Sequence, residues 1–338
     1  MNKCYASACA AIFALLCNSA LAQDKIKISM PGFAMPNITV AYAVDGGFMK
    51  AEGLDAEILQ VERRDLATMA VLSGDVIASV SDPIEIATAV DRGADLKVVA
   101  GTVTNAAPFL VGDSSVTLDQ STWKGKTAAL FVPPNTLYTL FVRELKLGGW
   151  QTVEKDVYRY KPGDPPTAYL RVTFGKRGTD LAALLAGRAN LAVLHEPDAS
   201  TAVLRGGKVR LRSFTGDFPQ LLWSTLNTSG KAIKEKPDVV RKVVRGLNAA
   251  LADVHTNPEK VIAFAEQAFG KADPQVVHSA IKTLLGAGIF PKDCMISEAG
   301  WASNIELISL TEPNTKAAGI SFGQLADTSF CTDALKNK

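Results

Sequence analysis

Short apolar runs alternate with stretches of helical periodicity over the first two thirds of the chain. In the first hundred residues the pattern predicts strands over 25–30, 55–61, 76–80 and 96–101, and helices over 39–49, 66–72 and 83–92. Strands that alternate with helices in this way are typical of βα units on a mainly parallel sheet. The start of the chain is therefore expected to form an α/β lobe.

The alternation starts again after residue 115. The pattern predicts strands over 126–131, 169–174, 191–195 and 209–214, and helices over 137–147, 180–186 and 197–204, with residues 160–168 as a Pro-rich loop. From residue 221 onward the pattern becomes helical, and apolar residues recur at spacings of three and four over 239–254. A chain of 338 residues exceeds what one core usually organises, so two lobes are expected.

The first 22 residues differ from the rest of the chain. Lys3 is their only charged residue, an apolar run covers 8–16, and Ala20-Leu21-Ala22 has the small-x-small form of a signal-peptidase site. We interpret the segment as a secretory signal peptide that is cleaved after Ala22. An uncleaved membrane anchor and a lipid-modified Cys17 are the alternatives; the apolar run is short for a bilayer span.

Cysteine usage agrees with export to an oxidising compartment. Three of the five cysteines lie in the predicted signal peptide, and only Cys294 and Cys331 remain in the mature chain. An even pair of this kind is usually bonded outside the cytoplasm. A disulfide across this separation stabilises by about 4 kcal/mol in the chain-entropy model.

Charge is distributed unevenly along a chain whose formal net charge is only +2. Residues 116–215 hold 15 Lys and Arg against 8 Asp and Glu, so the second lobe is basic and the remainder is acidic. A basic lobe could attract an anion, although a dispersed surplus also suits an ordinary solvated surface.

Sequence signals for an enzyme are missing. His195, His255 and His278 are the only histidines, and none has a second His or Cys at metal-ligand spacing. The chain has no G-x-S-x-G elbow, no Walker A loop and no G-x-G-x-x-G motif that opens a helix. Binding without catalysis, and without a metal or cofactor, is therefore expected.

Four loops that follow predicted strands are the candidates for a binding site. They cover residues 30–37, 81–83, 132–138 and 195–197. Ligands of open α/β sheets bind at the carboxyl ends of strands, where the following helix directs its backbone N–H groups at them. Each loop also suits plain helix capping, because Ser, Asp, Asn and Thr are good N-cap residues and Pro fits the first helical turn.

Five segments, taken in order, resemble the ABC-transporter substrate-binding proteins of the nitrate, sulfonate and taurine type. They are DGGFMKAEGLDAEI (45–58), DRGADLKVVAG (91–101), WKGKTAAL (123–130), ALLAGRANLAVLHEP (183–197) and the helical segment 236–265. The resemblance implies a bilobal periplasmic-binding-protein fold of the second type. It divides the chain into a discontinuous first lobe (23–115 and 216–338) that carries the C-terminal helices, and a second lobe (116–215).

The resemblance also implies a small-molecule ligand in the cleft and a monomer that docks on an ABC permease in the inner membrane, with no nucleic acid among its partners. The cleft loops are matched by motif position, which predicts these ligand-binding residues: Phe33, Met35, Ser81, Asp82, Asn135, Thr136, Leu137, Tyr138 and Glu196. Lys176 or Arg177 could add a cation near the cleft.

The ligand class stays open at this stage. Helix N-termini and the basic lobe favour an anion, whereas Asp82 and Glu196, if both face inward, favour an amine or a ring N–H. A zwitterion or an aromatic acid, such as a taurine-like or aromatic carboxylate ligand, satisfies both. The alternatives to an importer component are an enzyme on the same scaffold, acting on a pyrimidine-like or sulfur-containing molecule, and a partner of a membrane sensor.

Overall fold

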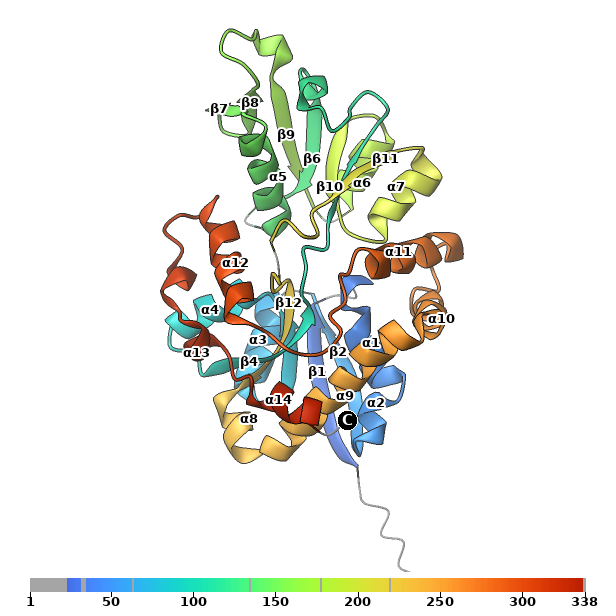
Figure 1. Ribbon diagram of the computed structural model, residues 1–338, viewed down its shortest axis with the longest axis vertical. Helices are drawn as coiled ribbons and strands as arrows, with labels where there is room; N and C mark the ends of the chain where they lie inside the picture. Colours follow the sequence, from blue (N-terminus) through green and yellow to red (C-terminus); the bar gives the residue numbers. More distant parts are fainter. Residues whose placement is uncertain are drawn as a thin grey trace, which may run out of the picture.

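Two separate sheets organise the computed structural model, which describes residues 23–31, 35–62, 64–133, 135–176, 178–218 and 220–336 (Figure 1). The first sheet has the strand order β2-β1-β3-β12-β4. Its strands are β1 (Asp24–Pro31), β2 (Leu54–Val61), β3 (Ala78–Ser81), β4 (Leu96–Val103) and β12 (Ser224–Ser229). β1 runs parallel to β2 and β3, and β12 runs antiparallel to β3 and β4.

The second sheet has the order β11-β5-β10-β6-β9-β8-β7. Its strands are β5 (Phe109–Gly112), β6 (Thr127–Phe131), β7 (Gln151–Glu154), β8 (Val157–Arg159), β9 (Leu170–Gly175), β10 (Leu191–Leu194) and β11 (Val209–Ser213). The chain passes between the sheets twice, between β4 and β5 and again between β11 and β12. The expected two-lobe α/β fold is confirmed.

Helices cover both sheets, as the alternating pattern predicts. Those of the first lobe's βα units are α1 (Ile38–Asp45), α2 (Phe48–Ala51), α3 (Arg64–Ser73) and α4 (Pro83–Asp91). The second lobe has α5 (Thr136–Leu147), α6 (Thr179–Leu185) and α7 (Asp198–Gly206). Short 3-10 turns lie at Met35–Asn37, Gln120–Trp123, Pro166–Ala168 and Lys316–Gly319.

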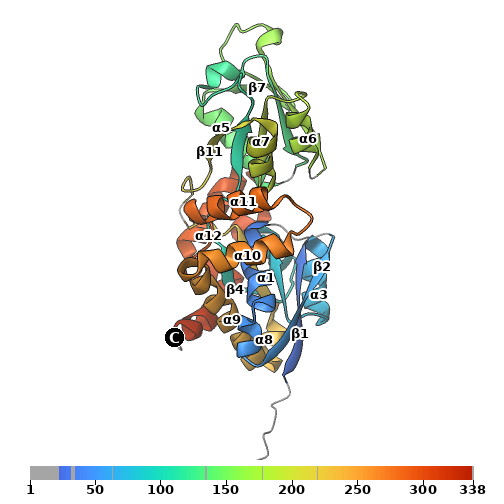
Figure 2. The ribbon, with the colours of Figure 1, turned by 90° about the vertical axis from the view of Figure 1, so that its right-hand side faces the viewer.

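The C-terminal part is helical and belongs mainly to the first lobe. It contains α8 (Gly230–Glu235), α9 (Pro237–Thr256), α10 (Pro258–Ala268), α11 (Pro274–Gly286), α12 (Glu298–Ser309), α13 (Phe322–Leu325) and α14 (Ser329–Lys336). The apolar stripe predicted along α9 is buried and packs against α1 and α2. Two of these helices reach the second lobe, since α11 contacts α7 and α12 contacts α5 (Figures 1 and 2).

The boundary predicted at residue 115 falls too late. β5 pairs with β10 and β11 and so belongs to the second sheet. The βα alternation in the sequence restarts after residue 115 and predicts the boundary there, but the apolar run 107–112 before it contains β5. The crossing actually precedes Phe109, because the apolar side chains of β5 complete the second sheet.

Strand β12 is a second difference from the expectation, which placed only helices after residue 221. Its sequence, STLNTS, is polar, yet every residue in it is buried. The polar side chains are accommodated because they bond to the neighbouring strand: Thr225 donates to the Ser81 carbonyl and Asn227 donates to the Ser79 carbonyl. The expected helix over 39–49 is also divided, at Gly47, whose φ of 89° is open mainly to glycine.

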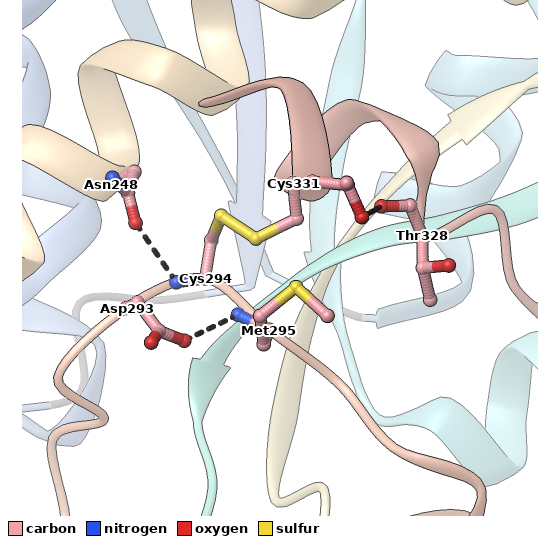
Figure 3. The surroundings of a disulfide bond; sticks show 7 residues. Asn248, Asp293, Cys294, Met295, Thr328 and Cys331 are labelled. Carbon is pink, nitrogen blue, oxygen red and sulfur yellow. Dashed lines mark hydrogen bonds between the residues drawn. A yellow bond between two sulfur atoms is a disulfide. The ribbon is translucent and has the colours of Figure 1, made fainter. Parts of the chain in front are cut away.

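Cys294 and Cys331 form a disulfide that ties α14 to the segment before α12 (Figure 3). On one side of it, the Cys294 backbone N–H donates to Asn248 of α9. The predicted signal peptide, 1–22, lies outside the described residues. Within the described ranges, no helix is both long and apolar enough to cross a membrane.

Candidate functional site

A cavity of about 300 Å³ lies between the two lobes. Helix α4 of the first lobe, helix α5 of the second and the C-terminal helix α12 with the turn after it supply its walls. The lining residues are Asp82, Ile84, Glu85, Asn135, Thr136, Thr139, Asn304, Leu307, Ile308 and Glu312. The N-termini of two helices from different lobes therefore meet at one cavity.

On the first-lobe side, Asp82 is the N-cap of α4. Its Oδ1 accepts a hydrogen bond from the Ile84 backbone N–H at 2.8 Å, and Pro83 occupies the first turn. Glu85 follows one turn in and accepts a bond from Thr68 of α3 at 3.4 Å. The capping role that the sequence allows for Asp82 is present, and the same residue also lines the cavity.

On the second-lobe side, Asn135 is the N-cap of α5. Its Oδ1 accepts from the Tyr138 backbone N–H at 2.9 Å, while its Nδ2 donates to the carbonyls of Phe131 and Val132. All of the polar atoms of this amide hold the loop in shape. Thr136, the next residue, is half-buried at the cavity wall, so its hydroxyl is the better placed of the two to meet a ligand.

Helix α12 closes the remaining wall, and none of its residues is among the predicted binding residues. The buried Asn304 amide bonds to both the N–H and the carbonyl of Leu222, at 3.0 Å each, and so fixes the second crossing between the lobes. The hydroxyls of Thr139 and Thr311 meet across the lobes at 2.8 Å. No local motif marks these α12 residues, because their role depends on where α12 docks.

Several of the predicted binding residues lie away from this cavity. Met35 is fully buried in the first-lobe core. Leu137 and Tyr138 pack against the second-lobe core, where the Tyr138 ring meets Phe174. Ser81 is buried at the end of β3, and its hydroxyl has no hydrogen-bond partner in the described part of the chain. Phe33 and Arg177 lie outside the described residues, and Lys176 is exposed.

Glu196 forms an ion pair and a hydrogen bond inside the second lobe. Its side chain is 0% exposed and pairs with the Arg210 guanidinium at 2.5 Å, and it also accepts from the Ser200 backbone N–H at 2.9 Å. Burial raises the pKa of this carboxyl, and the facing Arg210 charge opposes that rise only in part. Glu196 thus anchors Arg210 and the start of α7, and is not part of the cavity wall.

The histidines have local partners. The His195 ring packs edge-on against Trp223, with 5.5 Å between centroids, near the second crossing. His255 contacts the Phe290 and Pro291 carbonyls, and His278 lies 3.4 Å from Glu266. Over the described ranges, no group of three or more His, Cys, Asp or Glu side chains is arranged to hold a metal ion.

A larger hollow of about 790 Å³ lies at the opposite end of the first sheet. It is bounded by the N-terminal ends of β1 and β2 and by α8, and charges of both signs line it. All of its walls come from the first lobe. We therefore favour the smaller inter-lobe cavity as the candidate site, because both lobes contribute to its walls.

This arrangement of two α/β lobes, joined by two crossings and enclosing a cavity, is the fold of the periplasmic binding proteins. Residues 36–142 match the model of a family described as NMT1/THI5 like. Among the curated proteins, none matches this sequence.

Solved structures similar to this chain include components of importers. The zinc-bound ligand-binding component of an ABC-type import system from Staphylococcus aureus is 14% identical, with a TM-score of 0.69, and the match covers 92% of this chain and 99% of that one. The periplasmic aliphatic sulphonate-binding protein of Escherichia coli is 15% identical, with a TM-score of 0.67 and coverage of 90% and 92%. The periplasmic nitrate-binding protein of Synechocystis is 12% identical, with a TM-score of 0.67 and coverage of 93% and 89%. At these identities the likeness establishes the fold alone.

Proposed function

We propose that this protein is an exported solute-binding protein that captures a small organic ligand between its lobes and delivers it to the permease of an ABC importer. The observation that carries the proposal is the inter-lobe cavity, in which Asp82 of one lobe and Thr136 of the other begin helices at the same hollow. The sulphonate- and nitrate-binding proteins of the same fold support it. The predicted signal peptide supports a periplasmic location. We expect the protein to act there as a monomer.

The cavity favours a zwitterion or a small organic acid with a hydrogen-bond donor over a bare inorganic anion. The N-termini of α4 and α5 direct positive dipole ends toward it, which stabilises an anionic group such as a sulfonate or carboxylate. Glu312 and Asp82 place carboxylates on the same walls, which favours an ammonium or N–H group on the ligand. Apolar contacts from Leu307 and Ile308 suit a carbon skeleton, either aliphatic or aromatic.

A thermal-shift screen over sulfonates, aromatic carboxylates, nitrate, amino acids and pyrimidines tests this proposal, because any ligand that binds only the folded protein raises its melting temperature. Thr136→Ala should weaken binding of the best ligand by roughly 2- to 10-fold, the loss of one hydrogen bond, while the melting temperature of the ligand-free protein stays nearly unchanged. Thr152→Ala, on an exposed strand of the same lobe, is the matched control.

Two outcomes would overturn the proposal. One is a ligand whose affinity is the same in wild type, Thr136→Ala and Thr152→Ala, since it would then bind elsewhere. The other is recovery of the ligand in a chemically altered form, which would point to the alternative of an enzyme on the same scaffold.

A further inference from the structure

Helix α11 is attached to the first lobe at both ends. The helix before it, α10, packs against α9 and α1. After it, the Cys294 carbonyl accepts a hydrogen bond from the Gly101 backbone N–H of β4, and the Cys294 N–H donates to Asn248. Yet α11 lies against α7 of the second lobe in both views (Figures 1 and 2). This helix therefore spans the gap between the lobes without being part of either chain crossing.

The face of α11 that meets the second lobe is polar. Gln275, Ser279 and Thr283 are spaced by four residues and so lie on one stripe of the helix. Each of them contacts a different side chain of the second lobe: Gln275 accepts from Arg205 at 3.3 Å, Ser279 meets Ser200 at 3.3 Å, and Thr283 accepts from Arg210 at 3.1 Å. We call these three pairs the α11 seam.

Another face of the helix is apolar and buried. Val277, Ala280, Ile281 and Leu284 have no exposed surface and belong to a core cluster that includes residues of α9 and α10 and also Ala199 and Ala202 of α7. Separating them would expose apolar surface, which is costly. The seam contacts, in contrast, are hydrogen bonds between hydroxyl, amide and guanidinium groups. When such a bond breaks at the surface, both groups bond to water instead, and the net free energy lost is small. Because both ends of α11 are attached to the first lobe, the seam lies on the side of α11 that opens if the lobes move apart.

The second-lobe side of the seam is held in place beforehand. The buried Glu196 carboxylate binds Arg210 at 2.5 Å, and the Arg210 guanidinium also donates to Ser200 at 3.2 Å. Arg210 is thus oriented by its own lobe and needs no rearrangement to reach Thr283. Such preorganisation reduces the entropy lost when a contact forms.

We propose that the α11 seam is a reversible latch that holds the two lobes in the arrangement seen here, and that its strength sets the balance between closed and open forms. This inference goes beyond the proposed function, because it concerns the ligand-free protein and does not depend on which ligand is bound. A latch of this kind tunes apparent affinity, since the affinity for a ligand scales with the population of the competent form.

Double electron–electron resonance, which measures the distance between two spin labels, tests the latch on the ligand-free protein. Spin labels at Lys50→Cys and Lys155→Cys report on the exposed surfaces of the first and second lobes, while the native cysteines remain bonded to each other. Thr283→Arg places a cation beside the Arg210 guanidinium and should produce a longer distance population. Thr283→Glu, at the same site, presents the opposite charge to Arg210 and should keep the short distance.

Two further variants complete the design. Lys282→Ala changes a neighbouring exposed residue off the seam and should leave the distance distribution as in wild type. Ser200→Cys with Ser279→Cys, oxidised, joins the two sides covalently and should abolish the long population when combined with Thr283→Arg. An unchanged distribution in Thr283→Arg, with native circular dichroism, would overturn the latch, as would equal lengthening in Lys282→Ala.

Discussion

Glu196 and Arg210 form an ion pair in which the carboxylate is more deeply buried than the guanidinium. Removing one partner should therefore change the free energy of unfolding by a different amount than removing the other. The Glu196 side chain is 0% exposed, whereas that of Arg210 is 26% exposed. Arg210→Met keeps the apolar stem but leaves a buried carboxylate without its counter-charge. Breaking a buried pair in this way typically costs about 3–5 kcal/mol of folding free energy.

The reverse substitution should cost much less. Glu196→Gln removes the charge from the interior, keeps an oxygen that can accept from the Ser200 backbone N–H, and leaves an Arg210 that water can reach. Loss of one charge-assisted bond costs on the order of 1–2 kcal/mol, and removal of the charge whose burial raises the Glu196 pKa offsets part of that cost. Arg210→Met should therefore destabilise the protein more than Glu196→Gln does, by at least about 1 kcal/mol.

Urea unfolding at neutral pH, followed by circular dichroism, measures both free energies of unfolding. The double variant Glu196→Gln with Arg210→Met is the control, since removing both charges should recover part of the loss seen in Arg210→Met. A larger loss in Glu196→Gln than in Arg210→Met would refute the reasoning, because the burial of the carboxylate would then not dominate the pair.

Three more predictions follow from the same structure. Burial raises the pKa of Glu196, so the protonated carboxyl is favoured in the folded protein. The stability that this group contributes is fully present below its unfolded pKa of about 4.3 and is lost as pH rises through its folded pKa. The curve of stability against pH for Glu196→Gln, measured by thermal unfolding, should lack this decline. Removing the disulfide by Cys294→Ala with Cys331→Ala should lower the free energy of unfolding by about 4 kcal/mol in the chain-entropy model, and an unchanged urea midpoint would contradict its structural role. Asn304→Ala should cost about 2–4 kcal/mol, because the Leu222 N–H and carbonyl lose their partner in a buried segment; if Asn304→Ala unfolds at the wild-type urea concentration, the amide does not anchor the crossing.

The sequence predicted well those elements whose pattern is set by their own residues. The apolar runs at 25–30 and 191–195 are strands, and the periodic stretches 83–92 and 137–147 are helices, within a residue or two. Strand β12 could not be predicted in this way, because its Ser, Thr and Asn side chains are satisfied only by neighbours such as Ser81, far away in sequence. The position of β5 depends likewise on its pairing with β10.

The residues of the candidate site likewise include some that local sequence predicts and some that depend on distant parts of the chain. Asp82, Asn135 and Thr136 could be predicted because helix starts after strands carry local signals. The α12 wall could not, since its residues become site residues only through docking. Glu196 has the same local signature as Asp82, an acid before proline at a helix start, yet Arg210 from the following strand engages it. Local sequence therefore identified the helix starts, but not which acid lines the cavity.

The central claim is that a ligand binds between the lobes at the start of α4 and α5. The most direct test is the crystal structure of the protein with the compound that most raises its melting temperature. The account predicts ligand density in the inter-lobe cavity, with contacts to Thr136 of one lobe and to the Asp82 helix start of the other. Density confined to one lobe, for example in the hollow beneath β1 and β2, would contradict it.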